Sequence, residues 1–200
     1  KQNIESQMEY LKYQISPHFL MNTLNNIHAL IDFDSKMAKG SVMELSHMLR
    51  HILYDSSESV TTLDKEITFL ESYIKLMRLR YIDEVNITFS HPDVASSARI
   101  KLPPLLLIVL VENAFKHGIS YKNKSFININ ISTENNELSC VVANSRHNND
   151  KQSTERSGIG LNNITKRMDI LFGENYTLTT DNTDNDVYIV ELVIPVTTNK

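Results

Sequence analysis

The apolar residues of this 200-residue chain change their spacing near Tyr81, and the change limits the folds open to it. Up to Tyr81 they follow the 3.6-residue repeat of an α-helix. Beyond it, short stretches alternate apolar with polar residues, as half-buried strands do. The sequence therefore predicts a helical first part, followed by a second part built from strands and helices.

The first part contains three amphipathic helices, each with a narrow apolar seam. The seams are Leu20, Leu24, Ile27 and Ile31; Val42, Leu45, Leu49 and Ile52; and Leu63, Ile67, Leu70, Ile74, Met77 and Tyr81. Thr61 and Asp64 fit a capping box at the start of the third helix. So few helices leave their seams uncovered, which favours an intermolecular bundle, most simply a homodimer.

The second part is predicted to be an α+β sandwich over residues 84–200. Its strands are expected at 85–90, 126–133, 137–144 and 187–194, with "ENNE" as the turn between the middle two. A helix over 103–118 begins with prolines suited to a first turn and ends at Gly118 in the C′ role, where a left-handed backbone is common. A second helix ends in the same way at Gly173.

Composition excludes several classes of partner and site. The formal charge of −4, from 20 basic and 24 acidic residues, gives no basic footprint for nucleic acid. The single cysteine, Cys140, rules out an internal disulfide and is expected to be a small core residue. No stretch approaches the roughly 18 apolar residues of a membrane span.

Pro17 and His18 stand inside the first helix, in "QISPHFLMNTLNNI". On a helical wheel His18 lies about 160° from Leu20, on an outward face with Asn22 and Asn25. Proline removes one backbone hydrogen bond and kinks the helix, at a cost of about 3 kcal/mol. An outward imidazole beside a kink suits a ring that must be presented to something bulky, and neutral imidazole is a competent nucleophile. The alternative is an ordinary solvated polar face.

Two motifs in the second part suit a nucleotide pocket. "LVENAFKHG" places Glu112, Asn113, Lys116 and His117 on the last turns of an apolar helix. "SGIGL", residues 157–161, is a glycine pair opening a helix, where backbone amides can approach phosphate. Together they offer a carboxamide oxygen for Mg²⁺ and amides for phosphates, although each alone is also consistent with an ordinary helix end.

These three motifs, in this order, resemble those of the LytS-type sensor histidine kinases, and the resemblance covers almost the whole chain. It implies that residues 1–83 form a helical phosphoacceptor and dimerisation domain. Residues 84–200 would form an ATP-binding domain of the fold shared by histidine kinases, gyrase and MutL. The chain would be the cytoplasmic part of a bacterial inner-membrane protein, and would reach the membrane only through segments outside this sequence.

The resemblance also implies roles for individual residues. His18 would take the γ-phosphoryl group of ATP and pass it to an aspartate of a response regulator. Asn113 would coordinate Mg²⁺, with Lys116 and His117 near the phosphates. Gly158 and Gly160 would border a lid formed by residues 145–157, and they and Leu161 would help to bind the nucleotide.

Two positions depart from the family pattern. Phe19 follows the phosphoacceptor where many histidine kinases have an acidic base, so Glu112 is assigned that role as the carboxylate nearest the expected Mg²⁺ site. Asn144 stands where an Asp-x-Gly-x-Gly box would supply a carboxylate to adenine, and the glycines are absent. An amide oxygen still accepts that hydrogen bond, but without charge, so weaker ATP binding is expected.

Two other functions compete with the kinase. A dimeric signalling module with a decayed nucleotide pocket explains the missing glycines, and an ATP-hydrolysing clamp explains the pocket but leaves His18 without a role. His47 and His51 have zinc spacing but no third ligand, so a solvated helix face is expected there. Met37, Met43, Met48 and Met77 are expected to pack the helical bundle.

Overall fold

The fold comes from a computed structural model that describes residues 17–53, 59–81, 85–120, 122–147 and 154–198. Within its helices, the side chains of residues 17, 18, 154–161 and 163 lie outside the description. The helices in chain order are α2 (Pro17–Ile31), α3 (Ser35–Leu53), α4 (Leu63–Arg80), α5 (Val94–Ser97), α6 (Ile108–His117) and α7 (Thr154–Phe172). None of these helices is both long and apolar enough to cross a bilayer.

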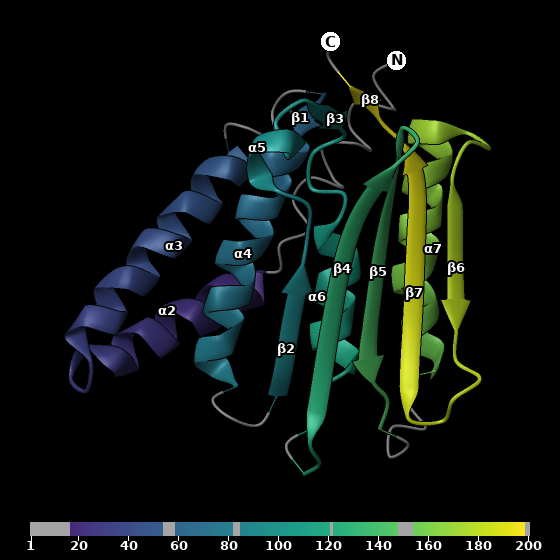
Figure 1. The fold of residues 1–200 in the computed structure, drawn as a ribbon. Helices are drawn as coiled ribbons and strands as arrows, with labels where there is room; N and C mark the ends of the chain where they lie inside the picture. The colour runs from purple at the N-terminus through teal and green to yellow at the C-terminus, as the bar shows by residue number, and fades with distance from the viewer. Residues whose placement is uncertain (1–16, 54–58, 82–84, 121, 148–153, 199–200) are drawn as a thin grey trace.

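Two sheets organise the strands. β2 (Val85–Ser90), β4 (Ser125–Glu134), β5 (Glu137–Ser145), β7 (Val187–Pro195) and β6 (Thr177–Asp181) form a mixed sheet in that spatial order, in which only β2 and β4 run parallel. A small antiparallel sheet joins β1 (Thr61–Thr62), β3 (Ile100–Leu102) and β8 (Thr197–Thr198). The α+β prediction is confirmed, since α6 and α7 lie together on one face of the larger sheet (Figure 1).

The large sheet follows the two-residue alternation of its sequence. In β4, Ile127, Ile129 and Ile131 are buried, whereas Asn128 and Asn130 are exposed. Asn135 and Asn136 take positive φ angles of 50° and 63°, the left-handed pair that a tight hairpin turn requires. All four expected strands and this turn are confirmed. β1, β3, β6 and β8 are short and were not predicted.

The helical part departs from the predicted seams. In α2 the buried residues are Phe19, Thr23 and Ile27, whereas Leu24 and Ile31 are 50% and 53% exposed. α4 is buried on most of its circumference, because it lies between α3 and the sheet (Figure 1). The α4 seam is therefore covered within one chain, while apolar residues of α2 remain uncovered.

Two helix boundaries differ from expectation, and a third agrees with it. α4 begins at Leu63 after Thr62, which makes no capping bond, and the Thr61 hydroxyl is buried without a hydrogen-bond partner, so the predicted capping box is wrong. α6 begins at Ile108, so the prolines at 103 and 104 precede the helix rather than form its first turn. Gly173 has the expected positive φ of 60° after α7.

Candidate functional site

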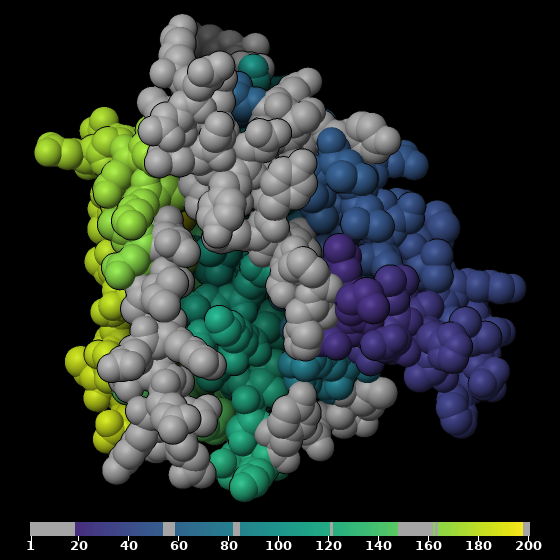
Figure 2. Space-filling model, turned by 180° about the vertical axis from the view of Figure 1, so that it is seen from behind, coloured from purple at the N-terminus to yellow at the C-terminus, as the bar shows by residue number. Residues whose placement is uncertain are grey.

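α6 carries the first candidate cluster on its last two turns. Val111, Ala114 and Phe115 are buried beneath it. Glu112, Asn113 and His117 are half-buried, and Lys116 is exposed. The helix is held against β4 and β5 by its apolar face, so its polar residues collect along the opposite side. Seen from behind, α6 (teal) lies between α2 (purple) and α7 (lime) (Figure 2).

Glu112 has an unusual acidity for a carboxyl group. Burial raises its pKa from the ordinary 4.5 to about 7, although Lys116 acts in the opposite direction. Burial also raises the pKa of the Tyr73 hydroxyl well above its usual range, and the charge of Glu112 adds to that effect. Glu112 therefore lies close enough to α4 to affect Tyr73, and its carboxyl group can exchange a proton near neutral pH.

A run of three aromatic rings joins the first helix to α6. The ring of Phe19 stacks on Tyr73, with centroids 5.0 Å apart. Tyr73 meets Phe115 edge-on at 5.6 Å. All three rings are buried. His18 precedes Phe19 in α2, but its side chain is outside the described residues. The rings therefore bring the backbone next to His18 towards the helix that carries Glu112 and Asn113.

Asn144 packs against the end of α6. It is 3% exposed, on the same face of β5 as Leu138, Cys140 and Val142, and its Nδ2 donates to the carbonyl oxygen of Ser145 at 2.8 Å. A Cβ added to Gly118 would lie 2.7 Å from the Cβ of Asn144. Gly118 has a φ of −90°, so close packing, rather than the predicted left-handed C′ conformation, explains the glycine.

The remaining predicted site residues lie on α7. Gly158, Gly160 and Leu161 fall inside this helix, which begins at Thr154, so the glycine pair does not open the helix as predicted. Of the expected lid, residues 145–157, the middle part 148–153 is outside the described residues, while Ser145 ends β5 and residues 154–157 belong to α7. Ile164 and Met168 are buried and hold α7 on the sheet.

The sequence did not predict one buried polar cluster, which consists of Glu66, His51, Leu105 and Arg167. Glu66 Oε1 accepts a hydrogen bond from the Leu105 amide at 2.8 Å and lies 3.2 Å from His51 Nε2. Arg167 donates to the carbonyl oxygens of Leu105 and Pro104 at 2.6 and 2.5 Å. No local pattern could have paired residues this distant in sequence, and a charged residue in a helix is more often solvated.

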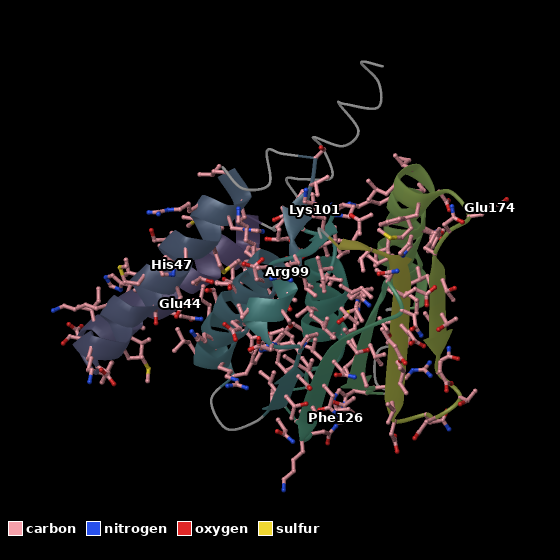
Figure 3. All side chains as sticks on the ribbon, turned by 45° about the horizontal axis from the view of Figure 1, so that its top comes forward. Glu44, His47, Arg99, Lys101, Phe126 and Glu174 are labelled. Carbon is pink, nitrogen blue, oxygen red and sulfur yellow. The ribbon has the colours of Figure 1, made fainter. Side chains whose placement is uncertain are left out.

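The histidine pair on α3 divides between two environments. His47, which is labelled together with Glu44 in Figure 3, is exposed. His51 is buried, and its ring stacks on Phe69 with centroids 4.9 Å apart. The predicted solvated face is therefore wrong for His51. Of the methionines, Met48 and Met77 are buried but Met37 and Met43 are exposed. Within the described ranges, no group of three or more His, Cys, Asp or Glu residues could hold a metal ion.

The side chains along α6 fit Mg²⁺ and a nucleotide by their chemistry. Asn113 supplies a half-buried carboxamide oxygen, the hard donor that Mg²⁺ accepts alongside phosphate and water. Lys116 on the last turn of the same helix offers positive charge to phosphates. Asn113 could therefore hold Mg²⁺ with a triphosphate.

The histidine kinase family model matches residues 6–85. Sensor protein LytS of Oceanobacillus iheyensis is 32% identical over 96% of this chain, which spans 34% of that relative. Sensor histidine kinase/phosphatase LytS of Staphylococcus aureus (strain MRSA252) is 28% identical over 90% of this chain and 33% of the relative. The chain thus spans about a third of the length of the curated relatives it matches.

Solved structures share the fold at low sequence identity. The histidine kinase domain of the Erythrobacter litoralis EL346 blue-light activated histidine kinase superposes with a TM-score of 0.51 and 13% identity, over 97% of this chain and 93% of that chain. A nucleotide-free catalytic domain of histidine kinase ThkA gives a TM-score of 0.50 and 18% identity, over 69% and 98% of the two chains. The chain therefore has the fold of histidine kinase catalytic domains, and by the family match and its relatives it is similar in sequence to the LytS-type sensor histidine kinases.

Proposed function

We propose that the chain is the catalytic core of a sensor histidine kinase, which transfers the γ-phosphoryl group of Mg-ATP to His18. The observation that carries the proposal is the contact of Phe19 with Tyr73 and of Tyr73 with Phe115. Through these rings the helix of the proposed phosphoacceptor packs towards the helix of the proposed nucleotide site within one chain. Phosphoryl transfer depends chiefly on such positioning and on charge neutralisation.

In the proposed step, one ring nitrogen of His18 attacks the γ-phosphorus, and the bond to the oxygen bridging the β- and γ-phosphorus atoms breaks, releasing ADP. The other ring nitrogen then carries a proton on a cationic ring. Glu112 accepts that proton as the general base, leaving phosphohistidine with a neutral ring and an anionic phosphoryl group. Its pKa of about 7 suits this role, because a base works best when its pKa lies near the working pH.

The nucleotide contacts remain proposals for individual residues. Asn113 would hold Mg²⁺, which neutralises phosphate charge when bound. Lys116 and His117 would face the phosphates, Gly158 and Gly160 would border the lid, and Leu161 would lie beside them in the nucleotide site. The amide oxygen of Asn144 would accept a hydrogen bond from adenine.

The organisation of the chain supports the wider proposal. Residues 1–83 would be the phosphoacceptor and dimerisation domain, and residues 84–200 the ATP-binding domain. Uncovered apolar side chains on α2, α3 and the turn between them support a homodimer: Met21, Leu24, Ile31, Phe33, Met37 and Met43. The phosphoryl group would pass to a response regulator aspartate. Any membrane attachment would lie in segments outside this chain.

Labelled ATP tests the proposal. The parent chain and two variants, His18→Gln and His28→Gln, are incubated with γ-labelled ATP and Mg²⁺. His28 lies on the same helix and is exposed, so its substitution controls for the loss of a histidine. Label on the parent and on His28→Gln, and its loss from His18→Gln, is the expected result. Label that persists on His18→Gln would exclude His18 as the acceptor.

A second candidate function is the signalling module with a decayed pocket. The burial of Asn144 and its hydrogen bond to Ser145 favour it. The amide group of Asn144 is buried and already bonded to Ser145, so it needs to turn before it can meet adenine. Calorimetric titration with Mg-ATP separates the two candidates. The kinase predicts saturable binding, whereas no heat of binding at millimolar nucleotide would favour the module. ADP release over many turnovers without phosphoprotein would instead support the ATP-hydrolysing clamp.

A further inference from the structure

The turn between β3 and α6 has an unusual backbone. Leu105 has a φ of +54°, a left-handed conformation that a side chain with a Cβ adopts at a cost. The residue is also buried, with 3% of its surface exposed. Strained conformations of this kind persist only where the surroundings fix them. The contacts made by Leu105 therefore need an explanation.

Two charged side chains hold the peptide groups around Leu105. Glu66, on α4, accepts a hydrogen bond from the Leu105 amide, and Arg167, on α7, donates to the carbonyl oxygens of residues 105 and 104. Both side chains are buried, and Glu66 is fully so. Bonds to charged groups are stronger than those between neutral groups, so these fix the turn firmly. We call Glu66, Leu105 and Arg167 the turn clamp.

The charges of the clamp depend on each other. The second carboxylate oxygen of Glu66, Oε2, is buried and has no hydrogen-bond partner. Burial lowers the pKa of the Arg167 guanidinium, and the negative charge of Glu66 acts to raise it again. Burying a lone carboxylate or a lone guanidinium costs free energy. The opposite charge nearby offsets this cost for both Glu66 and Arg167.

The position of the turn gives the clamp a consequence for the site. α6 begins at Ile108, three residues after Leu105, and Glu112 and Asn113 follow on the same rigid helix. Glu66 is on α4, where Tyr73 holds Phe19, and Arg167 is on α7, whose first turns contain Gly158 and Gly160. One turn thus connects α6 to the two helices whose positions matter for phosphoryl transfer.

We propose that Glu66 and Arg167 are positioning residues for phosphoryl transfer, because they fix α6 relative to α4 on one side and α7 on the other. This inference rests on the proposed kinase function. Glu66 connects the nucleotide part to the helical part, so its loss acts on the transfer step. Arg167 connects two elements of the nucleotide part, so its loss acts on nucleotide binding.

Steady-state kinetics separate these two effects. Glu66→Gln keeps an oxygen for the Leu105 amide but loses the charge, and should lower kcat for His18 phosphorylation about tenfold with KM for Mg-ATP nearly unchanged. Arg167→Lys keeps the charge but cannot span both carbonyl oxygens, and should raise KM about tenfold. Glu44→Gln is the matched control. Glu44, on α3, accepts a hydrogen bond at 2.9 Å from Lys75 on α4, the helix of Glu66, and this bond lies away from the turn.

The fold of each variant is checked by circular dichroism and thermal melting. If Arg167→Lys does not fold, Glu66→Gln decides alone. Rates of both variants within about twofold of Glu44→Gln would overturn the proposal. It would also fail if kcat fell only in proportion to the unfolded fraction, which is what a purely structural role predicts.

Hydrogen exchange of the backbone amides of α4 tests the turn clamp independently of catalysis. In the parent and in Glu44→Gln, addition of Mg-ATP should slow exchange in α4, and in Glu66→Gln it should not. If the parent binds nucleotide but forms no phosphohistidine, the kinase proposal fails and this exchange result still decides on the clamp. Equal protection of α4 in all three proteins would contradict the coupling. A parent that binds no nucleotide would overturn both proposals.

Discussion

The ring of Phe19 stacks on the ring of Tyr73, with the two planes inclined by 28°. Phe19 directly follows the proposed phosphoacceptor, and Tyr73 belongs to a helix that also meets the nucleotide part through Phe115. The ring of Tyr73 therefore joins Phe19, beside the proposed phosphoacceptor, to Phe115 in the proposed nucleotide part. Its loss should affect both stability and phosphoryl transfer.

Tyr73→Ala should destabilise the chain by about 3–5 kcal/mol, because it removes a fully packed aromatic side chain. Tyr73→Phe keeps the ring and should cost less than about 1.5 kcal/mol. Urea unfolding measures both values. Where Tyr73→Ala remains folded, His18 phosphorylation at saturating Mg-ATP should fall by tenfold or more, on the order expected for a misplaced acceptor. An unchanged rate would show that the stack does not position the acceptor.

The stability of the chain should depend on pH through Glu112. Its folded pKa of about 7 exceeds the ordinary 4.5, so the folded state binds the proton more tightly than the unfolded state. The associated stability is present below about pH 4.5 and is lost as the pH rises through about 7. The free energy of unfolding of the parent, relative to Glu112→Gln, should fall by up to about 3 kcal/mol across this window. A constant difference between the two proteins would contradict the shift.

Two glycine substitutions should have opposite effects. Gly118→Ala places a Cβ 2.7 Å from both the Ala114 carbonyl oxygen and the Asn144 Cβ, so it should destabilise by about 1–3 kcal/mol. Gly40 lies within α3 with nothing within 4 Å of an added Cβ, so Gly40→Ala should stabilise by about 0.5–1 kcal/mol. Chemical unfolding of both variants is the measurement. A neutral Gly118→Ala would mean that Asn144 is free to move away.

Asn144→Asp should destabilise the nucleotide-free chain, although it restores the residue type of the family box. An aspartate cannot donate the bond that Nδ2 now gives to Ser145, and a buried carboxylate would face that carbonyl oxygen, at a cost of about 1–3 kcal/mol. Asn128→Asp is the control, because Asn128 is exposed and accepts from Thr88, which a carboxylate also does. Equal unfolding midpoints for the two variants would contradict this account of Asn144.

The sequence predicted the sheet well because its signal is local. Alternation over residues 126–133 and 137–144 needs only neighbouring side chains, and the Asn135–Asn136 turn follows from their tolerance of positive φ. The burial of Cys140 follows from the same alternation. The burial of Glu112 could be inferred only in part, since its helix is apolar but its side chain lies near a helix end.

Tertiary contacts account for what the sequence did not predict. The seam of α2 was placed on Leu20, Leu24, Ile27 and Ile31, of which Ile27 is buried. Leu24 and Ile31 are exposed, and Phe19 and Thr23 are buried in their place, because α2 packs against Tyr73. The prolines at 103 and 104 precede α6, since the turn after them is fixed by Glu66 and Arg167 from distant helices. Spacing within one segment carries no information about such partners.

Site mapping by mass spectrometry tests the central claim most directly. The chain is incubated with Mg-ATP and digested with trypsin without exposure to acid, because phosphohistidine is acid-labile. Cleavage at lysine releases residues 13–36, which contain both His18 and His28. Fragmentation of this peptide should place a single phosphoryl group on His18. A phosphoryl group on His28 or on another residue, or its absence from a chain that binds Mg-ATP, would contradict the proposed function.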